Sequence, residues 1–175
     1  MRRSYWFLSV ALAPLAFVAC GDSTGVFADA SVSMQDECDP ATFNAALGPG
    51  TCVRQGKVTF GQFNSALAAS KSVAEWQFVP TALAVRVGQS IQAMNNGGET
   101  HTFTQVAQFG GGMVPALNAA SGNPIEAPEC TALTSVDLVA AGSVFTTAPE
   151  TDVGTEHYQC CIHPWMRTTV TVMSP

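Results

Sequence analysis

The segment YQCCIHPWM, residues 158–166, places two adjacent cysteines, a histidine and a methionine on one short stretch near the C-terminus. It lies between EHYQC and TTVTVM, whose alternation of polar and apolar residues predicts strands. Cys160, His163 and Met166 therefore share a tight loop between two strands. His101 lies on a distant predicted strand, after NNGGET. If these donors converge on one ion, the fold must bring two sequence-distant segments together.

Alternation along HYQCC indicates which of the two cysteines faces inward. Tyr158 is an expected core residue, and Cys160 shares its face, whereas Cys161 points to the other side of the strand. The spacing agrees, because Cys161 would leave one residue before His163, too few to wrap a tetrahedral ion. We therefore expect Cys160 to be the ligand.

Cys160, His101 and His163, with Met166 as a weak axial ligand, form the donor set of a blue-copper centre. Thiolate and imidazole suit both Cu(I) and Cu(II), so the ion can change valence without changing its ligands, and a thioether tunes the potential. Zinc is the alternative metal. However, adjacent cysteines point to opposite sides of a strand, and structural zinc motifs space their cysteines further apart. The donor set therefore favours copper over zinc.

These segments resemble a known family. YQCCIHPWMRTTVTV is similar to the C-terminal ligand loop of small cupredoxins, most nearly the amicyanin-like pattern C-x2-H-P-x-M before a final strand. VGQSIQAMNNGGETHTF is similar to the upstream stretch of that family, where a turn glycine and an asparagine precede the first copper histidine. The resemblance covers roughly residues 76–175. It implies an all-β Greek-key sandwich of the amicyanin and plastocyanin type, one mononuclear copper and electron transfer.

Two positions depart from the family pattern. Thr102 stands where an asparagine usually braces the ligand loop, and Cys161 stands where serine or threonine usually follows the ligand cysteine. We therefore expect the usual contact between these two positions to be missing, and a disulfide at Cys161 to replace it.

Residues 1–19 have the parts of a secretory signal: two arginines, an apolar run and a small residue before Cys20. The ending FVAC, followed by glycine, resembles a bacterial lipobox, in which Cys20 is lipidated and becomes the mature N-terminus. Ordinary cleavage nearby, which would leave Cys20 as a spare thiol, is the alternative. We expect an exported protein of the cell envelope or periplasm, attached to a membrane through an N-terminal lipid only.

The charge of the mature chain limits its partners. Removing Arg2 and Arg3 with the signal lowers the count of Lys and Arg from 7 to 5, against 13 Asp and Glu, a net charge of −8. So acidic a chain is not expected to bind nucleic acid or anionic lipid. We expect a monomer whose redox partner is a basic, cytochrome-like protein.

An exported chain favours paired cysteines. Of the 6 cysteines, those other than Cys20 are odd in number, which fits two disulfides and one thiolate ligand. Cys38 and Cys52 flank a predicted short helix, and Cys161 faces away from the ligand side and can pair with Cys130. Four cysteines allow three connectivities, of which we prefer Cys38–Cys52 with Cys130–Cys161.

The first part of the mature chain divides into two stretches. Residues 20–35 are small, polar and aperiodic, and they predict a flexible tether. Residues 36–75 contain two short predicted helices, one capped by Asp39 and one that begins with the capping-box pair Thr59 and Gln62. This short helical N-terminal extension is expected to pack on one edge or end of a sandwich.

Residues 76–175 form the predicted cupredoxin domain. Their apolar residues recur with period two between turn signals, which predicts a β-sandwich or barrel. Residues 109–130, rich in Gly, Pro and Asn, predict a long loop, and SVDLVAAGSVFTT predicts two short strands.

The leading interpretation is an electron carrier and not an enzyme. The chain has 3 histidines, and two of them serve the one copper, so the additional histidines of a catalytic copper centre are absent. Pro164 and Trp165 are expected to form an apolar rim where His163 reaches the surface and the electron leaves. Alternatives are a copper carrier or chaperone that delivers the metal to an exported oxidase, and a structural module that has kept the fold alone.

Overall fold

The strands form two sheets in this computed structural model, which describes residues 30–175. One sheet has the order β2-β1-β4-β6, from β1 Ala30–Gln35, β2 Gln77–Val79, β4 Ile91–Asn95 and β6 Val144–Thr146. The other has the order β3-β8-β7-β5, from β3 Ala82–Arg86, β8 Arg167–Met173, β7 Gly154–Gln159 and β5 Thr104–Val106. The pairs β1–β4 and β3–β8 are parallel, and the others are antiparallel. The predicted Greek-key β-sandwich is confirmed.

Residues 30–35 are not the flexible tether that the sequence predicted. They form β1, which pairs with β2 on one side and with β4 on the other, and Val32 and Met34 are fully buried. In the sequence, the alternation of buried Val32 and Met34 with serines is too short to stand out from the small residues around it. The sandwich therefore begins at residue 30 and not at 76, while residues 1–29, with the predicted signal and Cys20, lie outside the described residues.

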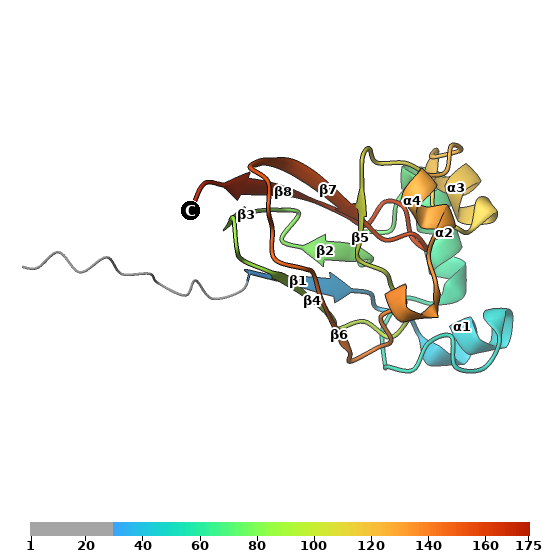
Figure 1. Ribbon diagram of the computed structural model, residues 1–175. Coiled ribbons are helices and arrows are strands. Elements are labelled where there is room, and N and C mark those ends of the chain that lie inside the picture. The colour runs from blue at the N-terminus through green and yellow to red at the C-terminus, as the bar shows by residue number, and fades with distance from the viewer. Residues whose placement is uncertain (1–29) are drawn as a thin grey trace, which may run out of the picture.

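The two predicted helices are confirmed, but they are an insertion and not an N-terminal extension. Helices α1 (Pro40–Leu47) and α2 (Phe60–Ser70) lie between β1 and β2 in the chain. The Asp39 carboxylate accepts a hydrogen bond from the Thr42 amide at 3.1 Å, and Thr59 with Gln62 forms the capping box. Both helices lie at the same end of the sandwich (Figure 1).

The segment 109–130 is not a plain loop. It contains α3 (Pro115–Ser121) and the start of α4 (Pro128–Thr131), each with a proline in its first turn. Further on, a short 3-10 turn at Ser135–Asp137 replaces the first of two predicted strands, so only β6 forms there. All four helices gather at the end of the sandwich away from the C-terminus (Figure 1).

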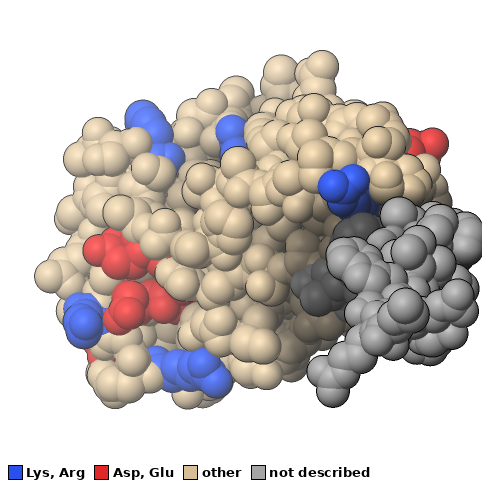
Figure 2. Space-filling view, turned by 90° about the vertical axis from the view of Figure 1, so that its left-hand side faces the viewer, with Lys and Arg blue, Asp and Glu red and all other residues tan. Residues whose placement is uncertain are grey.

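Aromatic side chains join this helical end to the core. The rings of Phe43 and Trp76 stack with centroids 5.7 Å apart, and Phe63 meets Trp76 edge-on at 4.9 Å. At the opposite end, Figure 2 shows few charged side chains, of both signs and in small separate groups. No helix among residues 30–175 is long and apolar enough to span a bilayer.

Candidate metal centre

The fold brings His101, Cys160 and His163 together. The Cys160 sulfur lies 3.8 Å from His101 Nδ1 and 3.9 Å from His163 Nδ1, and the three donor atoms all lie within 4.8 Å of one another. Cys160 is the free cysteine of residues 30–175. Cys160 and His101 are 0% exposed and His163 is 3% exposed. The predicted choice of Cys160 over Cys161 as the free, inward thiol agrees with this geometry.

Backbone contacts position the two donor segments. His101 exchanges two backbone hydrogen bonds with Val139, at 3.1 and 2.8 Å. The buried side-chain amide of Asn95 donates to the carbonyls of Glu99 and Val139. On the ligand loop, the Cys160 amide donates to the Met166 carbonyl at 3.0 Å, and the Met166 amide donates to the His163 carbonyl at 2.9 Å. These hydrogen bonds within the ligand loop hold its conformation without a metal ion.

The thiol also receives backbone donors. The amides of Thr102 and His163 each donate to Cys160 Sγ at 3.5 Å. Met166 is fully buried on the same loop. The site is thus surrounded by protein on the thiol side, with little space for water.

Both preferred disulfides, Cys38–Cys52 and Cys130–Cys161, are present. The expectation that the clasp between positions 102 and 161 would be missing was wrong: the Cys161 amide donates to Thr102 Oγ1 at 2.8 Å. The contact needs a backbone N–H at 161 and one acceptor oxygen at 102. Neither departure from the family pattern removes those groups, so the disulfide adds to the clasp and does not replace it.

Each histidine also faces a buried carboxylate that sequence reasoning missed. His101 Nε2 lies 2.8 Å from Asp36 Oδ2, and His163 Nε2 lies 3.5 Å from Glu99 Oε2. The Trp76 indole N–H donates to that same Glu99 oxygen at 2.7 Å. Asp36 is 65 residues from His101 in the chain, and no local pattern connects the two.

These neighbouring charges determine the ionisation of the site. Burial opposes a charged Cys160, but hydrogen bonds and charge from His101 and His163 hold the pKa of this thiol well below its ordinary value. Burial likewise opposes the charged forms of Asp36 and His101, yet their hydrogen bond lowers the pKa of Asp36 to about 2 and helps raise that of His101 to about 9. For Glu99, burial prevails and raises the pKa. The two histidines thus favour the thiolate form of Cys160.

His163 does not reach the surface, in contrast to the predicted rim. Pro164 is buried and Trp165 half-buried, and three aromatic rings surround the imidazole with centroids 5.5 to 6.4 Å away: Trp165, Phe63 and Trp76. A cavity of about 330 Å³ between α1, α2 and α3 is lined in part by His163 and Glu99. The inserted helices thus cover the side of the site that the sequence predicted to be open.

The donor set fits a metal ion. Imidazole nitrogen and thiolate sulfur bind a tetrahedral ion at about 2.0 and 2.3 Å, so one ion can join two such donors up to about 4.3 Å apart. The sulfur–nitrogen distances of 3.8 and 3.9 Å lie within that reach. All three donor atoms lie within 4.8 Å of one another, so together they can hold an ion between them.

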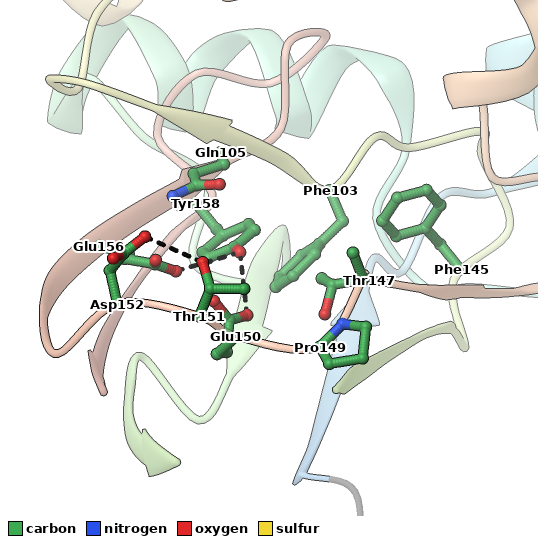
Figure 3. Close-up of a pocket in the computed structure, with 11 residues that line it drawn as sticks. Phe103, Gln105, Phe145, Thr147, Pro149, Glu150, Thr151, Asp152, Glu156 and Tyr158 are labelled. Carbon is green, nitrogen blue, oxygen red and sulfur yellow. Dashed lines mark hydrogen bonds between the residues drawn. The ribbon is translucent and has the colours of Figure 1, made fainter. Parts of the chain in front are cut away.

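A second cavity, of about 430 Å³, has none of these donors in its lining. There the Tyr158 hydroxyl lies between the carboxylates of Glu150 and Glu156, at 3.3 and 3.2 Å (Figure 3). Glu150, Thr147 and Pro149 come from the segment that follows β6 (Figure 3). The cavity is separate from the candidate metal centre.

The sheet order, with a Cys-x2-His-x2-Met loop before the last strand and a histidine from across the sandwich, decides the fold. The fold is cupredoxin-like. No protein-family model and no curated protein matches the chain in sequence.

The solved structures that are similar to the chain include several cupredoxins. They include a purple cupredoxin from Nitrosopumilus maritimus (16% identity, 83% of this chain and 100% of that one, TM-score 0.46). Another is oxidised plastocyanin from Dryopteris crassirhizoma (17%, 82% and 100%, TM-score 0.43). A third is a Cu(I) amicyanin mutant (20%, 58% and 78%, TM-score 0.39). Similarity at these identities and TM-scores supports no conclusion about function, which depends on the site itself.

Proposed function

We propose that this chain is a mononuclear blue-copper protein that carries single electrons between redox partners. His101, Cys160 and His163 would hold the copper, and Met166 would supply a weak thioether ligand. The observation that carries the proposal is the convergence of one free, buried thiol on two imidazole nitrogens, at 3.8 and 3.9 Å. Copper in such a donor set supplies a Cu(I)/Cu(II) couple at a fixed set of ligands.

The residues of the chain keep the site rigid and dry. Two backbone amides hold the Cys160 sulfur, and the Thr102–Cys161 clasp with the Cys130–Cys161 disulfide fixes the start of the ligand loop. Burial of the donors excludes water, which would otherwise compete as a ligand. A site that changes little with valence suits fast electron transfer.

Burial also supports an electron carrier over a copper chaperone. A chaperone must hand its ion to an acceptor through exposed, adaptable ligands, whereas His101 and Cys160 are 0% exposed. We propose no substrate turnover, because His157, the third histidine of the chain, is half-buried on β7 and is not among the grouped donors.

The route and setting of transfer are part of the same proposal. Trp165 is half-buried and its ring lies 5.5 Å from that of His163, so the proposed electron exit is Trp165, with Pro164 packed beneath the surface. We place the protein in the cell envelope as a monomer, held by a lipid at Cys20 and paired with a basic redox protein. The sequence alone supports these last statements.

The test is the absorption spectrum of the purified protein after Cu(II) addition. We expect an intense thiolate-to-copper band that a mild reductant bleaches and an oxidant restores. Cys160→Ala, His101→Ala and His163→Ala should each abolish the band. His157→Ala is the matched control and should keep it. A colourless wild-type protein, or a Cys160→Ala variant with unchanged colour and copper content, would refute the proposal.

A further inference from the structure

Each imidazole of the site lies between the Cys160 sulfur and a buried carboxylate. In each ring Nδ1 faces the Cys160 sulfur, and Nε2 faces a buried carboxylate, Asp36 for His101 and Glu99 for His163. The line of groups is therefore carboxylate, imidazole, thiolate, imidazole, carboxylate. When a carboxylate accepts a hydrogen bond from Nε2–H, Nδ1 is the nitrogen that can bind a metal, and Nδ1 lies on the same side as the thiolate.

The Asp36 carboxylate sits in a site built for an anion. Its Oδ1 accepts from the amides of Cys38 and Gly98, at 3.1 and 2.9 Å, and its Oδ2 accepts from the amide of Glu99 at 3.0 Å. Its side chain is 0% exposed. A side chain at Gly97 would collide with this carboxylate, so the turn after β4 is shaped around it. The negative charge is thus fixed in position against His101.

The Glu99 carboxylate is held less closely. It lies 3.5 Å from His163 Nε2 and shares the same oxygen with the Trp76 indole N–H. Its side chain is 8% exposed, and it lines the cavity between α1, α2 and α3. Its influence on the ring should be in the same direction as that of Asp36 but smaller.

A carboxylate near a metal acts on the two valences of the metal unequally. Attraction to a carboxylate grows with the charge of the ion, and low-dielectric surroundings screen it little. A carboxylate on the far nitrogen also makes the imidazole a stronger donor. Both effects stabilise the cupric form more than the cuprous form.

We propose that Asp36 and Glu99 are positioning residues that bias the copper site toward Cu(II) and so lower its reduction potential, with Asp36 the stronger of the two. This inference rests on the proposed function. It goes beyond it, because electron transfer requires only the donors, whereas the direction in which electrons flow depends on these two carboxylates.

The test compares Asp36→Asn and Glu99→Gln with Asp39→Asn in the full chain. Asp39 carries the same charge, lies three residues from Asp36 and is partly exposed at the start of α1. Asparagine caps a helix as well as aspartate does, so the control removes one charge and keeps the helix. The readouts are the Cu(II) and Cu(I) dissociation constants, measured separately against competing chelators, and the reduction potential.

Loss of an outer hydrogen-bond partner of a ligating histidine typically costs about 10- to 100-fold in metal affinity. We expect Asp36→Asn to weaken Cu(II) binding relative to Cu(I) binding by at least about tenfold, which is about 59 mV for one electron. Glu99→Gln should shift the ratio the same way by less, and Asp39→Asn should leave it within about twofold. A merely structural role would weaken both valences together and leave the ratio unchanged.

Each outcome decides the inference. Ratios for Asp36→Asn and Glu99→Gln that match the control, or that move toward Cu(II), overturn it while the copper function stands. If Asp36→Asn does not fold, Glu99→Gln decides alone, because glutamine keeps an acceptor for Trp76. If the wild-type protein shows no reversible copper band, the proposed function fails first and the inference fails with it.

Discussion

Phe63 on α2 packs against His163, and we expect its replacement by alanine to lower the free energy of unfolding strongly. The side chain is 3% exposed. Its ring contacts five aromatic neighbours, with centroids 4.9 to 6.4 Å away: Phe43, Phe60, Trp76, His163 and Trp165. Phe→Ala in a core costs about 3–5 kcal/mol. Because these rings cannot all collapse into the space, we expect about 4 kcal/mol for Phe63→Ala.

The measurement is urea unfolding of the metal-free protein, followed by the rate at which a chelator removes copper from the loaded protein. Phe78→Ala is the matched control, because Phe78 is 0% exposed and its ring packs against the ring of Phe103, with centroids 5.4 Å apart. Both variants should lose similar stability, and Phe63→Ala alone should release copper several-fold faster. A stability loss below about 1 kcal/mol, or equal release rates, would refute the packing of α2 as a cover over the site.

Three further outcomes can be checked. Replacing Cys130 and Cys161 together by alanine opens a loop with a sequence separation of 31, so the free energy of unfolding should fall by about 3.7 kcal/mol in urea titrations; a loss below about 1 kcal/mol would contradict this. Gly112→Ala places a methyl group against the Cys161 carbonyl, so the copper absorption band should shift and the Tm should fall; an unchanged spectrum and Tm would show that the ligand loop tolerates the methyl group. Burial and the neighbouring Glu156 raise the pKa of Glu150 to about 7, so its charged form is disfavoured in the fold and the contribution of Glu150 to stability decreases as pH rises from about 4.5 to 7. Glu150→Gln should therefore raise the Tm at pH 8 and change it little at pH 4; a gain that is the same at both pH values would contradict this.

The local parts of the site were predictable from the sequence. The spacing Cys160-x2-His163 and the alternation that turns Cys160 inward act over a few residues, so the backbone geometry of one strand and one loop decides them. Helix caps at Asp39 and Thr59 are equally local. Each of these predictions agrees with the structure because few other conformations satisfy the same short-range contacts.

Long-range contacts explain where the predictions were wrong. Residues 30–35 looked like a tether because a short strand of small residues shows its buried face only once β2 and β4 flank it. We expected His163 to reach the surface beside Pro164 and Trp165. No residue close to them in the sequence indicates that α2 packs there. We expected no contact between positions 102 and 161 because their side chains differ from the family pattern. The contact forms nevertheless, because its donor is the backbone N–H of Cys161.

The amino-acid sequence by itself determined the inward cysteine and the sandwich class, because spacing and period are properties of neighbouring residues. It predicted the donor set and favoured one disulfide pairing among three. Only the tertiary structure decided which charges surround the donors. Asp36 lies after β1 and His101 after β4, and it is the parallel pairing of those two strands that sets their side chains 2.8 Å apart. A contact between residues 65 positions apart cannot be predicted from the local sequence pattern, because it exists only when the sheet has formed.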